Sequence, residues 1–286
     1  VIRDGVEIIA DFAFYQCRYL KKITIPDSVK YIGDNAFYCC FGLTDIVIPD
    51  SVISIGNGAF CKCRSLKKIT LSKGMTTIGS FTFSACDNLK EITIPENVTS
   101  IIENPFMGSH TRINCESPYF TVDHDVLYNK DKTMLISYLS SREKFAIPEG
   151  VTSIGKFAFF SNPTLKEISM PKSLTAIPRE AFLSCENLSK VLIKDCVTSI
   201  GSTAFGDCRN LSDVFIPHSV TAIHSFAFYN CDKLKKIIIP EGVTCIGNSA
   251  FAFCESLTKI DIPNTLTCIE QCAFEACKNL KEITIS

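Results

Sequence analysis

Apolar and polar positions along the chain repeat with a fixed period. One period is the phrase Ile-Pro-x-x-Val-x-x-Ile-Gly-x-x-Ala-Phe-x-x-Cys-x-x-Leu-x-x-Ile-x. Its phenylalanine falls at Phe14, Phe37, Phe60, Phe83, Phe106, Phe159, Phe182, Phe205, Phe228, Phe251 and Phe274. The step between these positions is constant except from Phe106 to Phe159, where additional sequence intervenes. A period held in phase over eleven units predicts a solenoid of stacked coils.

The pattern inside one unit predicts a short strand followed by a turn. Ile23-Thr24-Ile25 alternates as a strand does, and Pro26 ends it because proline cannot donate to a sheet. Gly33 suits a change of chain direction. The apolar residues from Ala36 to Leu43 are spaced by about three, which indicates a short helical or 3₁₀ turn or a loop on the opposite side. One unit cannot bury its apolar side chains alone, so we expect the strands to stack in a parallel sheet.

The extra residues after Phe106 predict an insertion. Val126–Tyr128 and Met134–Tyr138 have strand character, and Asn129–Lys132 is polar turn sequence between them. We therefore expect repeats 1–5 over residues 1–106, with the fifth interrupted, an inserted β-hairpin segment over 107–143, and repeats 6–11 over 144–286. We expect one continuous array, with a hinge at the insertion as the alternative.

The repeated phrase resembles that of the BspA-like surface proteins of bacteria and protists, a leucine-rich-repeat subclass with 23-residue units. Ser117–Phe120 followed by Asp125–Tyr128 also resembles the recurring hairpin insertion of that family. The resemblance implies a right-handed leucine-rich-repeat superhelix with its short parallel strands on the concave face. It also implies secretion or cell-surface display and adhesion to host or matrix proteins or glycans. Neither end has the polar pattern of a capping repeat, so we expect a piece of a longer protein.

Outward strand positions form rows once the units are aligned. One row is charged and alternates in sign at nearly every step: Lys22, Asp45, Lys68, Glu91, Lys144, Glu167, Lys190, Asp213, Lys236, Lys259 and Glu282. Opposite charges on neighbouring strands attract, so we predict a stabilising ladder on the surface. The step from Lys236 to Lys259 joins like charges and is a candidate contact for an anionic ligand.

The next outward row contains the strongest candidate for a binding surface. Most of its members are small or polar, but Leu192, Phe215 and Ile238 are consecutive and apolar. Exposed apolar patches with polar surroundings often mark interaction sites. The alternatives are that a neighbouring segment covers the three residues, or that they are scattered strand-forming residues without a role. A third, gapped row of lysines indicates a mildly basic rim or, alternatively, a track for an acidic glycan.

The sixteen cysteines mostly follow the repeat. Nine occupy one row, Cys17, Cys40, Cys63, Cys86, Cys185, Cys208, Cys231, Cys254 and Cys277, and Ser109 and Asn162 fill its remaining places. Substitution by small polar residues predicts buried thiols that donate weak hydrogen bonds to the backbone. Cys245 with Cys268, and Cys39 with Cys61, lie in adjacent units and are candidate disulfides. The chain has no Cys-x-x-Cys pair, so we expect no structural zinc site.

Composition and missing motifs narrow the function further. The net charge is −1, which gives no overall basic field for nucleic acid. Apolar runs are too short for membrane insertion, and phosphate-loop, His-Glu-x-x-His and Gly-x-Ser-x-Gly motifs are missing. Asp123-His124-Asp125 is expected to be a solvated turn, with a cation site as the alternative.

These observations predict a monomeric binding module with no catalytic residues, cofactor or metal. We expect it to bind a protein or glycan through the concave sheet, helped by the turn at Asn129–Lys132, at the cell surface or outside the cell. A non-adhesive scaffold or spacer inside a longer protein is the alternative, and an enzyme is the least favoured class.

Overall fold

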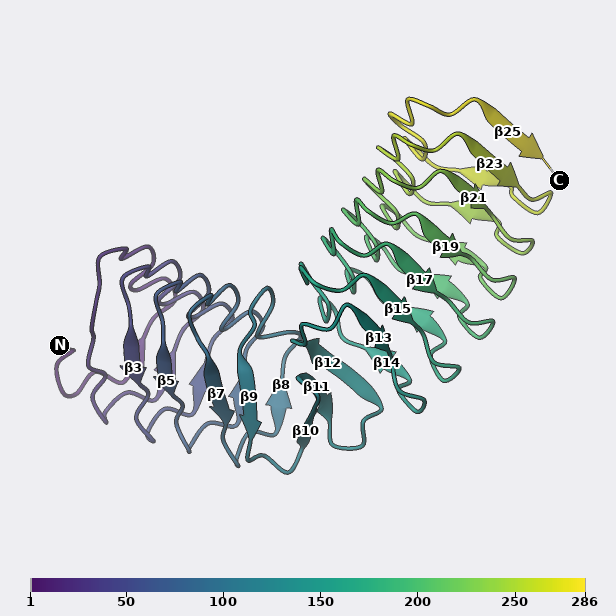
Figure 1. Ribbon diagram of the computed structural model, residues 1–286. Helices are drawn as coiled ribbons and strands as arrows, with labels where there is room; N and C mark the ends of the chain where they lie inside the picture. The colour runs from purple at the N-terminus through teal and green to yellow at the C-terminus, as the bar shows by residue number, and fades with distance from the viewer. Residues whose placement is uncertain (1, 286) are drawn as a thin grey trace. The chain divides into compact units, whose positions relative to one another are not determined.

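The computed structural model describes residues 2–285 and consists of short β-strands joined by turns (Figure 1). The chain forms two compact units. The first comprises Val1–Lys132 with Ile136–Ser140, and the second comprises Thr133–Leu135 with Ser141–Ser286. In each unit the chain winds into coils, and equivalent strands of successive coils pair in parallel, one repeat apart.

The second unit contains two kinds of parallel strand. The longer ones, which we call the long-strand sheet, form two hydrogen-bonded groups. One group contains β13 (Lys144–Ala146), β15 (Glu167–Ser169), β17 (Lys190–Leu192) and β19 (Asp213–Phe215), and the next contains β21 (Lys236–Ile238), β23 (Lys259–Ile262) and β25 (Glu282–Ile285). The two-residue strands β16 (Ala176–Ile177), β18 (Ser199–Ile200), β20 (Ala222–Ile223), β22 (Cys245–Ile246) and β24 (Cys268–Ile269) form one sheet, which we call the short-strand sheet. The equivalent strand of the preceding coil, β14 (Ser153–Ile154), belongs to a different sheet. Met134 and Leu135, from β12 (Met134–Tyr138), pair with Ser153 and Ile154 of β14.

The first unit repeats this arrangement. Its long-strand sheet consists of two hydrogen-bonded pairs, β3 (Asp45–Val47) with β5 (Lys68–Thr70) and β7 (Glu91–Ile94) with β9 (Arg112–Cys115). Its short-strand sheet contains β1 (Ile8–Ile9), β2 (Tyr31–Ile32), β4 (Ser54–Ile55), β6 (Thr77–Ile78) and β8 (Ser100–Ile101). β10 (Phe120–Asp123) and β11 (Val126–Asn129) form an antiparallel hairpin. His124 and Asp125 both have positive φ in its two-residue turn, as tight hairpin turns of this kind require.

The parallel long strands confirm the strand prediction from Asp45 onward, but Ile23–Ile25, the corresponding segment of the first coil, is not a strand. Three further features differ from the sequence interpretation. The short-strand sheet was not foreseen. Strand β9 lies within the range assigned to the insertion, yet it pairs in parallel with β7, so Arg112 rather than Lys144 follows Glu91 in the charged row. The segments expected to form helical turns contain hydrogen-bonded turns, and residues 2–285 contain no helix.

The hydrogen bonds of these turns explain why they are not helical. Alternate amides bond to the next coil, as in Phe37 N to Ala59 O (2.7 Å) and Cys39 N to Cys61 O (2.9 Å). The amides between them bond three residues back, as in Tyr38 N to Asn35 O (3.1 Å). Positive φ at Asn35 and Cys39 reverses the chain locally. Half of the donors that a helix would use are therefore committed to the neighbouring coil.

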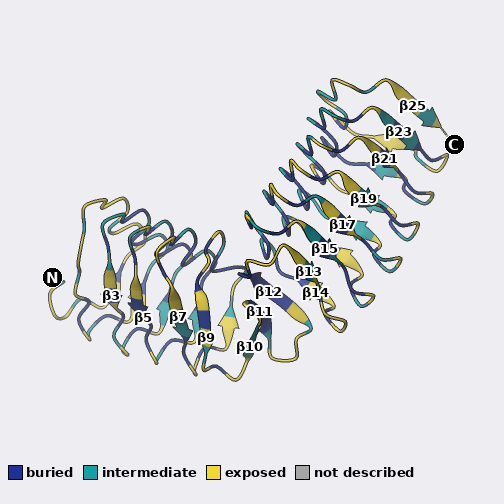
Figure 2. Cartoon of the chain, in the orientation of Figure 1, coloured by how far each residue is buried: buried dark blue, intermediate teal, exposed yellow. Residues whose placement is uncertain are grey.

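The core of each unit is built on the phenylalanine row, as the period predicts. Phe37, Phe60, Phe182 and Phe205 are fully buried. Successive rings stack with centroids 4.6 to 6.1 Å apart. Burial of one such side chain contributes about 1.5–3 kcal/mol. Buried and exposed residues alternate along the long strands (Figure 2), so the outer residue of each strand is free to vary without disturbing this core.

Candidate functional site

The long-strand sheet of the second unit exposes three apolar side chains in consecutive coils, which we call the apolar stripe: Leu192, Phe215 and Ile238. Their relative exposures are 42%, 53% and 48%. Leu192 pairs directly with Phe215, and β19 and β21 are in contact, so Ile238 continues the row. Each is the third residue of its strand, and the preceding residue points inward. The structure therefore places these predicted residues together on one exposed face.

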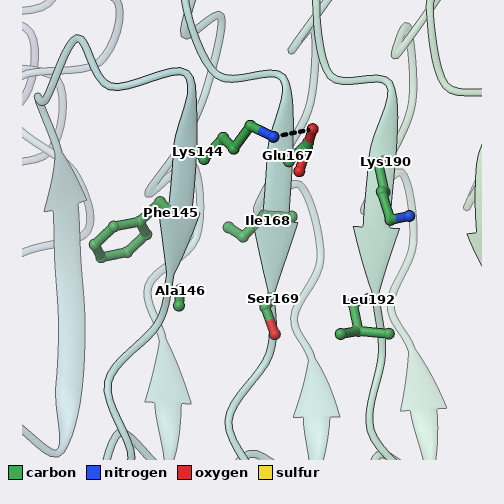
Figure 3. Close-up of a pocket in the computed structure, with 8 residues that line it drawn as sticks. All are labelled: Lys144, Phe145, Ala146, Glu167, Ile168, Ser169, Lys190 and Leu192. Atoms are coloured by element: carbon green, nitrogen blue, oxygen red, sulfur yellow. Dashed lines mark ion pairs between the residues drawn. The ribbon is translucent and has the colours of Figure 1, made fainter.

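A shallow recess of about 240 Å³ adjoins the stripe at Leu192. Ala146 and Ser169 precede Leu192 in the same row, and their small side chains leave the surface hollow there. Figure 3 shows these three residues at one end of their strands and the Lys144–Glu167 ion pair at the other. Pockets that hold a whole small molecule usually have a volume of about 300 Å³ or more. The recess therefore suits one side chain of a larger partner better than a complete small ligand.

The charged row along this sheet is largely neutralised by its own members. Nζ–carboxylate distances are 2.7 Å for Lys144–Glu167, 2.8 Å for Lys190–Asp213 and 2.7 Å for Lys259–Glu282. The pKa of Lys190 is raised because its ammonium hydrogen-bonds to Asp213. The alternation thus forms ion pairs of the predicted kind, each of which is exposed and contributes only about 0–1 kcal/mol.

Asp261 accounts for the like-charge step at Lys236 and Lys259. These lysines are paired in register, and Asp261 faces Ile238 in the next strand. Its carboxylate lies 3.3 Å from Lys236 Nζ and 3.6 Å from Lys259 Nζ. Desolvation raises the pKa of Asp261, but the two lysines outweigh it and the net pKa is lowered. An anionic ligand at Lys236 and Lys259 would have to compete with Asp261.

The hairpin turn of the first unit also pairs its own charges. Asp123 lies 2.7 Å from Lys132 Nζ and 2.6 Å from His124 Nδ1. The hydrogen bond from Lys132 lowers the pKa of Asp123. The Asp123-His124-Asp125 turn is present as expected, and Asp123 is already held by its neighbours.

The cysteine row forms the predicted hydrogen-bond ladder. From Cys40 onward, each thiol of the row donates to the carbonyl oxygen of the phenylalanine 26 residues earlier, as in Cys63 Sγ to Phe37 O (3.1 Å). Ser109 donates in the same way to Phe83 O at 2.9 Å. Burial raises the pKa of the Cys185 thiol to about 12, so it stays protonated at neutral pH. All sixteen cysteines, which lie within residues 2–285, are free, so neither candidate disulfide is formed.

One cluster was not anticipated from the sequence. Cys245, Cys268 and Glu270 bring their ligand atoms within 4.8 Å of one another at the outer side of the short-strand sheet. The two cysteines are neighbours in register. The sequence signal for this cluster is the pair of cysteines in one row, with an acid two residues after the second cysteine.

The comparisons with known proteins agree with this architecture. Among residues 2–285 there is no helix long and apolar enough to cross a membrane. No curated protein matches the chain. A leucine-rich cell surface protein from Faecalibacterium prausnitzii is similar over all of this chain and 86% of its own, with 27% identity and a TM-score of 0.69. The pneumococcal vaccine antigen PcpA matches 90% of this chain and 60% of its own, with 26% identity and a TM-score of 0.62.

A leucine-rich repeat protein from Bacteroides ovatus covers all of this chain and 76% of its own, with 27% identity and a TM-score of 0.56. The family model for the BspA type leucine rich repeat region matches residues 1–112, 136–244 and 198–286, with six copies. These matches include most of the chain and both solenoid units. The chain therefore belongs to the BspA-type leucine-rich-repeat family.

Proposed function

We propose that this chain is a non-catalytic binding module that engages a protein partner through the apolar stripe and the adjoining recess. The observation that carries the proposal is the exposure of Leu192, Phe215 and Ile238 in consecutive coils of a sheet whose other outward residues are mainly small or polar. Contiguous exposed apolar side chains gain free energy when a partner removes them from water, at roughly 25 cal/mol per Å².

Two features favour a protein partner over an acidic glycan. The stripe and the recess offer apolar contact area, which suits the side chains of an extended or folded protein. The lysines beside them already hold Glu167, Asp213 and Asp261, so few cationic groups are available for a polyanion.

The proposed setting is the cell surface or the extracellular medium, where the module would adhere to a host or matrix protein. One similar structure is named as a cell surface protein and another as a vaccine antigen, which supports this setting. A non-adhesive spacer role within a longer protein is the competing function, and the following experiment separates the two.

The test compares the wild-type protein with a Leu192→Ser, Phe215→Asp double variant in surface plasmon resonance against a panel of host matrix proteins. We expect saturable binding by the wild type and a loss of about 30-fold or more in the variant, because central apolar anchors typically contribute about 2 kcal/mol or more. The unfolding midpoint should stay nearly unchanged, because both side chains are half exposed.

Val47→Asp is the matched control. Val47 occupies the same row in the first unit and is 65% exposed, but its neighbour in the row is Thr70. This variant should bind like the wild type. Equal binding by the double variant would remove the stripe from the interface, and no saturable binding by the intact protein would favour the spacer role.

A further inference from the structure

The outer side of the short-strand sheet changes character at its last two strands. In most coils the first residue of the short strand is serine, threonine or alanine, as in Ser54, Thr77 and Ala222. Strands β22 and β24 carry Cys245 and Cys268 there instead, directly opposite each other. Ile246 of the first strand is buried, so Cys245 lies on the outward side, and Cys268 is exposed. Two thiols therefore face solvent side by side.

An acid from the following coil completes the group. The residue after the short strand is glycine in several coils, and at Gly247 a Cβ would lie 2.5 Å from the Ser225 amide nitrogen. Glu270 occupies this place in the last coil, and its Oε2 accepts a hydrogen bond of 2.7 Å from Asn248 N. The side chain thus reaches back across one coil to the coil of Cys245. Its oxygen and both sulfur atoms lie within 4.8 Å of one another.

We propose that Cys245, Cys268 and Glu270 form a binding site for a thiophilic divalent cation such as Zn²⁺. Two thiolates of a tetrahedral zinc ion stand about 4 Å apart, given Zn–S bonds of about 2.3 Å. The three groups therefore need only small side-chain rotations to meet one ion. Two sulfur ligands favour Zn²⁺ over Mg²⁺ or Ca²⁺, which prefer oxygen.

The coordination has one open position. Three protein ligands leave the fourth corner of a tetrahedron to water or to an external ligand. The hydrogen bond from Asn248 N orients the carboxylate, as supporting hydrogen bonds commonly do around metal ligands. Both cysteines lie on paired backbone strands, so the site is held by rigid elements rather than by a loop.

Cobalt provides the direct probe. The reduced chain of residues 1–286, free of metal, is titrated with Co²⁺ and followed by the thiolate-to-cobalt charge-transfer absorption in the near ultraviolet. We expect one equivalent to bind, and Zn²⁺ to displace it. Cys245→Ser and Cys268→Ser should each abolish the charge-transfer band. Glu270→Gln should weaken Co²⁺ binding by at least about 10-fold, the lower end of what even supporting residues around a metal contribute.

Cys272→Ser is the matched control, because Cys272 is exposed in the same coil but lies outside the cluster. It should leave the titration unchanged. A second measurement needs no variant: Zn²⁺ should slow the alkylation of Cys245 and Cys268, but not of Cys272, as read by peptide mass spectrometry. Charge-transfer absorption that survives both cysteine variants, or equal alkylation with and without Zn²⁺, would overturn the proposal. If the two cysteines form a disulfide in the isolated protein, its reduction should restore cobalt binding. Failure to restore it would also overturn the proposal.

Discussion

The long-strand sheets of the two units have the same kinds of residue at their inward positions and different kinds at their outward positions. Their inward residues are interchangeable aliphatic side chains, such as Ile69 in the first unit and Ile168 in the second, both buried. The outward row reads Val47, Thr70, Thr93 and Asn114 in the first unit. In the second unit it reads Ala146, Ser169, Leu192, Phe215, Ile238, Asp261 and Thr284.

This difference teaches which positions the fold constrains. The same coil geometry accepts threonine, asparagine or phenylalanine at the outer position, since that side chain does not enter the core. The outer row is therefore where sequence can change for recognition, and only the second unit has three successive apolar residues there. Measurements that compare equivalent positions in the two units can sharpen or break this distinction.

The largest effect on stability is expected from substitutions in the phenylalanine row that forms the core of each unit. Phe60→Ala in the first unit and Phe205→Ala in the second should each lower the free energy of unfolding by about 3–5 kcal/mol, because each removes a buried ring from a stack. Urea denaturation followed by circular dichroism measures both. A cost confined to one of the two variants would show that the cores of the units are not equivalent.

An intermediate effect is expected in the cysteine ladder, where the first unit already contains a natural exchange. Ser109 makes the bond that cysteine makes elsewhere, so Cys208→Ser in the second unit should be close to neutral. Cys208→Ala removes the donor and should cost about 0.5–1.5 kcal/mol. The difference between the two midpoints of unfolding is the readout. If Cys208→Ser lowers stability as much as Cys208→Ala, the hydrogen bond is not the reason why this row contains cysteine.

The smallest effect concerns acid pH and the charged row of the second unit. Lysine neighbours lower the pKa of Glu282, chiefly Lys259, and they lower that of Asp261 against its own desolvation. A carboxylate with a lowered folded pKa stabilises the fold above its unfolded pKa and loses that contribution as pH falls through the folded value. Stability should therefore decline as the pH falls below the ordinary values of 4.5 and 3.8.

Thermal melts between pH 6 and pH 3 measure this decline. An Asp261→Asn, Glu282→Gln double variant should show a shallower decline than the wild type, because two titrating groups are gone. Parallel curves for the two proteins would mean that this part of the ladder contributes nothing measurable to stability.

The sequence predicted the features that recur once per period. The positions of Phe37 and Cys63 in their rows were readable because the core requires the same residue type in every coil. The outward position of Phe215 followed from the alternation of its strand. These patterns lie within one repeat, and they recur in every coil of the solenoid.

The features that the sequence did not predict depend on contacts between coils. Strand β2 has only two residues, too few to show an alternating pattern. The turn around Phe37 has apolar spacing typical of a helix, but its amides are taken by the next coil. Glu270 joins Cys245 across a separation that no local motif encodes. Each of these requires knowledge of which residue lies one coil away.

The bonding of alternate turn amides to the next coil has a mechanical consequence. Each coil contacts only its neighbouring coils in the array. A force that pulls on one end of the chain must therefore break the hydrogen bonds of the terminal coil before it acts on the next coil. Each coil stores one repeat of chain, which spans about 80 Å when drawn out. Under a constant force, either unit would unfold one coil at a time from its end and lengthen in steps of this size. The coils that remain folded would keep their outward side chains in place.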